Sequence, residues 1–391
     1  MASVVVGFQS PSSTGVGKHR LGESSAISSS QSTDVDMEGL RSLGFTSGLC
    51  EALIRQKEET SHRFWILDNS GSMSIADGHR FVQSSRGEAQ LSPCTRWNEL
   101  QEAAIYHSKL AGFLQLPTEF QFLNSPGFFQ KSFVVRNEND ALKAQQTIKR
   151  AEPIGATPLT PTVESIRNKV KGMMPQLLQD GTSVSLVIAT DGLPTDSMGY
   201  GGKAENAKFT KALGSLTSFP VTIVIRLCTD DESVVDFYGN LDNSLELNLD
   251  VLDDFAGEAQ EVHTKNKWLS YGLPLHRFRE GAFRSRLADL LDERKFTKDE
   301  LRDFCGLLFG ESVAMDGLPD PQADWAGFHR EVDHLQAYED LVYNPMTRQM
   351  APWIQVPRLG ACFTKPGKEP CRYISSRSDR LKRTTCNVKL Q

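Results

Sequence analysis

Residues 64–72 read Phe64-Trp65-Ile66-Leu67-Asp68-Asn69-Ser70-Gly71-Ser72. The run of large apolar side chains predicts a buried strand that ends where Asp68 begins the next turn. This turn also carries hydroxyls at Ser70 and Ser72, so three oxygen-bearing side chains follow the strand at alternate positions. Oxygen ligands of mixed charge suit a hard divalent cation such as Mg²⁺. The stretch therefore predicts a metal site just beyond a strand end.

Two later segments complete the predicted site. Residues 184–189 form a second apolar run, which leads into Thr190-Asp191-Gly192, and Gly155-Ala156-Thr157 lies in a loop before a predicted helix. In open parallel sheets, ligands bind beyond the carboxyl ends of the strands, near the point where the strand order reverses. If the two apolar runs are neighbouring strands, we expect the carboxylates of Asp68 and Asp191 to converge.

This arrangement resembles the von Willebrand factor A domain and its metal-ion-dependent adhesion site. The resemblance rests on the Asp-x-Ser-x-Ser turn, the loop threonine and the Thr-Asp-Gly after the second run, and it covers roughly residues 60–265. The family's usual Gly-Gly-Thr stands here as Gly-Ala-Thr, a departure that keeps the threonine. The resemblance implies five metal ligands: Asp68, Ser70, Ser72, Thr157 and Asp191.

The ligand types indicate what the metal does. Three of the five implied ligands are neutral hydroxyls, which leaves the cation electron-poor, and Mg²⁺ keeps several exchangeable waters. A carboxylate from outside can displace one of these waters. The resemblance implies that this carboxylate is an Asp or Glu of a partner protein. We therefore expect divalent-metal-dependent protein–protein binding, with Mg²⁺, or Mn²⁺ or Ca²⁺, at the site.

Two other functions stay open. A Mg²⁺ ion held by aspartates could activate water in a hydrolase, but no His–Glu pair, Cys–His pair or Gly-rich phosphate loop lies beside Asp68 or Asp191 in the sequence. His79 follows in the same loop, and we predict a turn residue with a solvated ring. The other alternative is a scaffold that binds through C-terminal helices and has an idle metal site. We expect a binding protein, not an enzyme.

Composition sets the class of protein and its compartment. The chain has 391 residues, a net charge of −6, 39% hydrophobic and 24% charged residues, which fits a soluble globular protein. No apolar run approaches the ~20 residues that span a bilayer, and the first residues make a poor secretory signal. Seven scattered cysteines without a Cys-x-x-Cys pair predict a reduced, intracellular, cytoplasmic setting, with a nuclear or organellar address left open. The negative charge argues against non-specific nucleic-acid binding.

Strand and helix patterns alternate in the middle of the chain. This alternation predicts an α/β fold with a doubly wound, mostly parallel, Rossmann-like sheet flanked by helices. We expect strands over 63–67, 118–123, 131–136, 184–189, 221–227 and 245–252. We expect helices over 96–114, from a Thr160 cap to Pro175, over 203–216 and from Asp253 to about Thr264.

The flanking regions differ in composition. We predict a disordered Ser-rich segment (1–35), a helical lead-in (36–58), the α/β domain (60–265), a helical C-terminal region (266–360) and a basic disordered tail (361–391).

Three smaller features have simple interpretations. The acidic stretches 230–232 and 249–254 favour helix caps and turns over a calcium site, and His107 favours a satisfied core histidine over a ligand. A solvated helix face is favoured over nucleic-acid contact for four arginines interleaved with phenylalanines: Arg277, Arg279, Arg284 and Arg286.

Overall fold

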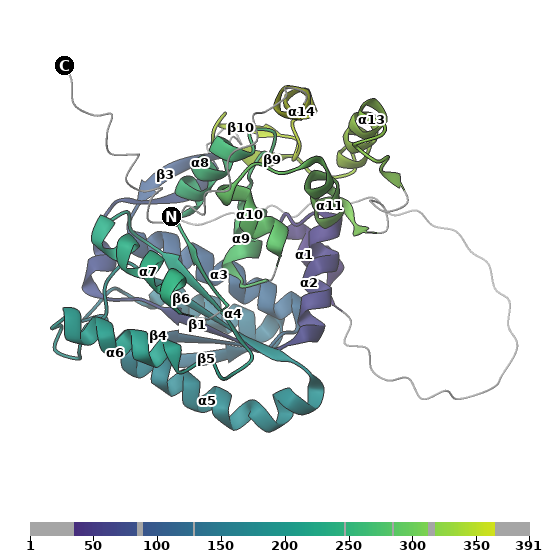
Figure 1. Cartoon of the computed structure of the whole chain (residues 1–391). Coiled ribbons are helices and arrows are strands. Elements are labelled where there is room, and N and C mark those ends of the chain that lie inside the picture. The colour runs from purple at the N-terminus through teal and green to yellow at the C-terminus, as the bar shows by residue number, and fades with distance from the viewer. Residues whose placement is uncertain are drawn as a thin grey trace, which may run out of the picture. The chain divides into compact units, whose positions relative to one another are not determined.

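A six-stranded sheet with the order β5-β4-β1-β6-β7-β8 forms the centre of this computed structural model (Figure 1). Five strands are parallel, and β5 lies antiparallel to β4 at one edge, which confirms the predicted doubly wound, mostly parallel sheet. The structure describes residues 35–83, 89–127, 130–245, 248–283, 285–311 and 317–363. The strands of the sheet are β1 (Thr60–Leu67), β4 (Thr118–Phe122), β5 (Ser132–Val135), β6 (Ser183–Thr190), β7 (Val221–Leu227) and β8 (Leu249–Leu252).

The strand order places β1 next to β6. Counted along the chain, the sheet reads third, second, first, fourth, fifth and sixth strand, so the order reverses between these two strands. They pair in parallel up to Leu67 opposite Ala189. Because parallel strands end at the same edge, the turns that follow β1 and β6 leave the sheet side by side at the switch point.

The sheet is covered by helices on both faces. Alternate β1 side chains, Phe64 and Ile66, pack into the core beneath α5, α6 and α7, whereas Trp65 and Leu67 pack toward α3 and α4. Figure 1 shows α5 and α6 along one side of the sheet. These helices are α3 (Arg96–Leu114), α4 (Glu138–Arg150), α5 (Leu159–Asp180), α6 (Lys203–Gly214) and α7 (Glu232–Ser244).

Two of the expected helix boundaries were wrong. Helix α5 begins at Leu159 rather than after Thr160, and it continues through Pro175 to Asp180. Pro175 removes one helix hydrogen bond, to the carbonyl of Lys171, but both residues are exposed and water can reach that carbonyl. The proline is therefore tolerated on the solvent side of the helix.

The acidic stretches cap helices, as predicted. The Asp231 carboxylate accepts from Ser233 N at the start of α7, a helix that the sequence patterns did not predict. The Asp254 carboxylate accepts from Gly257 N at the start of α8. Carboxylates at these positions satisfy free N–H groups and the positive end of each helix.

The lead-in and the C-terminal region share one hydrophobic core. Leu40 and Leu53 of the lead-in pack with Leu110 of α3 and with Leu275 and Leu301 of the C-terminal helices. These helices are α1 (Met37–Ser42), α2 (Ser47–Glu59), α8 (Phe255–Lys265), α9 (Leu273–Glu280), α10 (Arg286–Glu293), α11 (Lys298–Phe309), α13 (Trp325–Gln336) and α14 (Val356–Phe363).

Two short hairpins and a one-turn helix were not predicted. They are β2–β3 (Gly78–Gln83 and Ala89–Cys94), β9–β10 (Val342–Asn344 and Gln349–Ala351) and η1 (Gly71–Ser74). We predicted disorder over 1–35 and 361–391; residues 1–34 and 364–391 lie outside the described residues, and 361–363 form the end of helix α14. Within the described ranges, every helix is too short or too polar to cross a membrane.

A buried ionic cluster joins the sheet to α9. The Glu280 carboxylate accepts from Arg226 Nε of β7 at 3.0 Å and lies 3.2 Å from His107 Nε2 of α3. Burial by itself would raise the pKa of Glu280, but Arg277 and the neighbouring histidines hold this pKa well below its usual range. Burial lowers the pKa of His107 to about 3, so this ring is a neutral core histidine, as predicted.

The predicted solvated face of basic residues was wrong for two of its members. Arg277 contacts Glu280, and Arg279 donates to Glu258 at 2.7 Å, with both guanidinium groups buried. Arg286 is exposed, and Arg284 lies outside the described residues. Glu280 lies three residues after Arg277 on the same helix, whereas Glu258 lies 21 residues before Arg279, and no local pattern connects those two.

Glu280→Gln should lower the free energy of unfolding by about 3 kcal/mol, because it removes the charge partner of the buried Arg277 and leaves Arg226 with Glu99 alone. Urea denaturation at neutral pH measures this change. The matched control is Glu311→Gln, which breaks the exposed Arg55–Glu311 pair and should change stability by less than about 0.5 kcal/mol. Equal effects of the two variants would show that the buried cluster contributes no more than a surface ion pair.

Candidate metal site

Asp68 lies fully buried at the end of β1, and its carboxylate is held by the turns on both sides of the switch point. Its backbone N donates to Ala189 O of β6 at 3.0 Å. Ser70 N donates to Oδ1 at 2.8 Å, and Thr190 Oγ1 donates to Oδ2 at 2.6 Å. The orientation of the carboxylate is therefore set by its own turn and by the neighbouring strand.

The hydroxyls of the turn connect Asp68 to Asp191. Ser70 Oγ lies 3.1 Å from Ser72 Oγ, and Ser72 Oγ donates to Asp191 Oδ1 at 2.8 Å. Asp191 is itself buried at the end of β6. The structure thus brings four of the five predicted residues together in one continuous set of contacts.

Thr157, the fifth predicted residue, borders this group beside Gly192. Thr157 N donates to Thr195 Oγ1 at 2.9 Å, and Thr195 N donates back to Thr157 O at 3.0 Å. The Thr157 hydroxyl lies 3.6 Å from where a Cβ on Gly192 would stand. The residue is therefore adjacent to the Asp191 loop.

An asparagine pair that sequence reasoning missed aligns the loops. Asn69 Nδ2 donates to Asn124 O at 3.1 Å, and Asn124 N donates to Asn69 Oδ1 at 2.8 Å. Asn124 Nδ2 also donates to Ala156 O, and Gly71 N donates to Gly155 O at 3.0 Å. Gly155 has a φ of +82°, and a Cβ there would lie 2.7 Å from the Asn124 amide oxygen, so glycine is required. The sequence signal that could have revealed this pair is an asparagine two residues after the end of each of two strands, β1 and β4.

Arg96 is the second feature that the sequence did not reveal. It is the first residue of α3, directly after the Thr95 cap. Its Nη1 donates to Asp191 Oδ2 at 2.9 Å, and its Nε and Nη2 donate to the two carboxylate oxygens of Asp77 at 2.7 and 2.6 Å. Hydrogen bonding to Asp77 is the main cause that raises the pKa of Arg96. The same ion pair lowers the pKa of Asp77.

The site is short of positive charge around Asp68. Burial, followed by the charge of Asp191, raises the pKa of Asp68 to about 6. Two carboxylates and three hydroxyls form an all-oxygen donor set of the kind that Mg²⁺, Mn²⁺ and Ca²⁺ prefer. The residues present therefore fit a hard divalent cation.

His79 is not a turn residue, contrary to our expectation. It lies in strand β2 of the first hairpin, and its half-exposed ring places Nδ1 3.8 Å from Asp254 Oδ2. The nearby Asp254 carboxylate raises the His79 pKa. Among the described residues, no group of three or more His, Cys, Asp or Glu could hold a metal ion, so any cation here depends on the hydroxyls.

Without metal, Asp68 should make the protein less stable as the pH rises from about 4 to about 6. The folded state retains the proton up to a pKa of about 6, whereas the unfolded chain loses it near the usual aspartate pKa of 3.8. The contribution of Asp68 is therefore present at low pH and lost across this window, by roughly 3 kcal/mol in total. Urea denaturation in chelator gives the free energies of unfolding of wild type and Asp68→Asn at each pH, and their difference isolates the contribution of Asp68. A difference that does not change between about pH 4 and about pH 6 would contradict the prediction.

Comparison with solved structures found distant similarities. No family model matches the chain, and no match was found among curated proteins. The VWA domain of SpRpn10 is similar at 10% identity and a TM-score of 0.32, over 50% of this chain and 88% of that chain. The manganese-loaded Plasmodium vivax TRAP protein is similar at 12% identity and a TM-score of 0.30, over 50% of this chain and 69% of that chain. The fold assignment rests on the strand order and register of the chain itself.

Proposed function

We propose that this chain is an intracellular protein of the von Willebrand A type that binds a partner protein through a divalent cation. The supporting observation is the convergence of two buried carboxylates and their linking hydroxyls at the sheet's switch point. Residues that would hold Mg²⁺, Mn²⁺ or Ca²⁺ are Asp68, Ser70, Ser72, Thr157 and Asp191. A bound cation would supply a Lewis-acidic position for a partner's Asp or Glu carboxylate.

Exposed apolar side chains around the site support a protein partner. Ile75 follows the serine turn, Ile154 precedes Thr157, and Met198 and Tyr200 follow Asp191 in the next loop. All four apolar side chains are between 47% and 77% exposed. Large apolar side chains beside a polar anchor are typical of protein-interaction surfaces.

The hydrolase alternative has less support. In the described part of the chain, the side chains that hydrogen-bond Asp68 or Asp191 belong to Ser70, Ser72, Thr190 and Arg96. Hydroxyls and a guanidinium do not serve as a general base at neutral pH, and hydrolysis by an activated water needs such a base. Binding therefore accounts for the donor set better than catalysis does.

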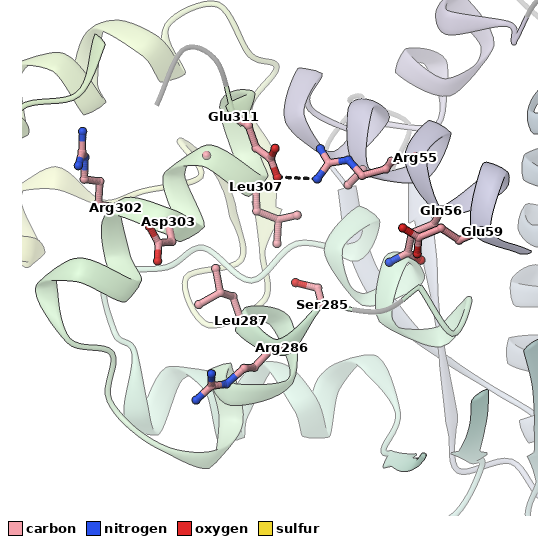
Figure 2. Close-up of a pocket in the computed structure, with 12 residues that line it drawn as sticks. Arg55, Gln56, Glu59, Ser285, Arg286, Leu287, Arg302, Asp303, Leu307 and Glu311 are labelled. Carbon is pink, nitrogen blue, oxygen red and sulfur yellow. Dashed lines mark hydrogen bonds and ion pairs between the residues drawn. The ribbon is translucent and has the colours of Figure 1, made fainter. Parts of the chain in front are cut away.

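A groove elsewhere supports the scaffold alternative. A cavity of about 500 Å³ lies between α2, α10 and α11, with Leu287 and Leu307 in its wall (Figure 2). Figure 2 shows charged side chains around it, including the ion pair between Arg55 and Glu311. A partner helix could bind there without any metal.

Mg²⁺ or Mn²⁺ should raise the melting temperature of the full chain by a few degrees, and chelator should reverse the shift, because a ligand that binds only the folded state stabilises it. Asp191→Ala should abolish the shift. Asp236→Asn, which changes an exposed carboxylate on α7, should retain it. Differential scanning calorimetry makes the measurement, and an unchanged wild-type melting temperature with each cation would remove the metal site.

Partner binding should need both the cation and the apolar surface. Affinity purification from the cells that make this protein should recover a partner in Mg²⁺ and lose it in chelator or with Asp68→Ala. Met198→Ser combined with Tyr200→Ser should lose the partner while keeping the thermal shift with Mg²⁺, since these side chains are not ligands. A partner that persists in chelator and with Asp68→Ala would favour the groove between α2 and α11.

A further inference from the structure

Arg96 places a permanent positive charge against one of the proposed metal ligands. Its side chain is only 11% exposed, and its Nη1 donates to the Asp191 oxygen that Ser72 does not use. A guanidinium stays protonated at all accessible pH values. One carboxylate oxygen of Asp191 therefore accepts from the Arg96 guanidinium, and the other accepts from the Ser72 hydroxyl.

Asp77 offsets the charge of Arg96 from the other side. It accepts two hydrogen bonds from the same guanidinium and is half exposed at the rim. The three carboxylates of Asp68, Asp77 and Asp191, with one guanidinium, leave a net charge of −2, which one divalent cation would neutralise. Without Arg96 the same cluster would have a net charge of −3.

The same contacts tie Arg96 to the loop that carries the serines. Arg96 N donates to Ile75 O at 3.0 Å, and Asp77 lies two residues further along that loop. The N-terminus of α3 is thereby fastened to the segment that follows Ser72. A change in the charge of Asp191 would therefore alter the contacts that Arg96 makes with this segment.

We propose that Arg96 is a built-in counter-ion that sets the cation affinity of this site, with Asp77 tuning it in the opposite direction. The proposal rests on the metal site proposed above. Arg96 weakens cation binding by repulsion, and it stabilises the metal-free protein by offsetting the repulsion between the Asp68 and Asp191 carboxylates. The site therefore binds a divalent cation only when the cation concentration is high enough to overcome the repulsion from Arg96.

A pair of variants separates this role from a merely structural one. Arg96→Gln and Asp77→Asn break the same ion pair from opposite ends. If the pair only held the loop in place, both variants would shift cation affinity in the same direction. If charge controls affinity, removing Arg96 tightens binding and neutralising Asp77 weakens it.

Calorimetric titration of the full chain with MnCl₂ at low ionic strength tests the proposal. Arg96→Gln should bind Mn²⁺ on the order of tenfold more tightly, and Asp77→Asn about threefold more weakly, because Asp77 is more exposed to solvent. Arg96→Lys keeps the charge without the planar fork, so its affinity should stay within about threefold of wild type. High salt should narrow the difference between wild type and Arg96→Gln.

Thermal melting provides the second readout. In chelator, Arg96→Gln should melt at a lower temperature than wild type, and Mn²⁺ should remove the deficit. Shifts of the same sign for Arg96→Gln and Asp77→Asn, or an Arg96→Lys that behaves like Arg96→Gln, would overturn the counter-ion role while leaving the metal site intact. Failure of the wild type to bind Mn²⁺ would overturn the metal site itself and this inference with it.

Discussion

Two buried carboxylates at adjacent strand ends are the constraint on which the candidate site depends. Asp68 and Asp191 leave β1 and β6 at the switch point, where the parallel pairing brings them to one edge. Burying like charges together is costly unless they are hydrogen-bonded and compensated. The hydroxyls and Arg96 reduce this cost, which explains why so many polar contacts concentrate at one edge of an apolar sheet.

Helix α3 connects this edge to the C-terminal helices. Arg96 at its first residue contacts Asp191, and Glu99, one turn later, pairs with Arg226 of β7. His107 further along contacts Glu280 of α9. Charged side chains on one helix therefore contact both the candidate site and the buried cluster, so a displacement of α3 would disturb both groups of ion pairs.

The parts of the structure that could be predicted are those that depend on nearby residues. The apolar runs that form β1 and β6 and the oxygen-bearing turn after Leu67 are local patterns. That the two strands are neighbours is a condition of the prediction, and the strand order meets it. Arg96 and Asp77 lie 19 residues apart, and nothing near either residue identifies its partner. The buried Arg279 looks like part of a solvated face for the same reason, because its partner Glu258 becomes apparent only when α8 and α9 pack.

The kinds of ligand at this edge of the sheet determine what a bound cation could do there. A site with many carboxylates would bind a cation tightly but would leave it little attraction for a further anion, whereas a donor set of three hydroxyls and two carboxylates, one of them shared with a guanidinium, leaves more of that attraction. Such a cation gains most from one additional carboxylate. In the proposed function, the exposed side chains of Met198 and Tyr200 would contact the protein that supplies this carboxylate, and the cation and the partner would stabilise each other's binding.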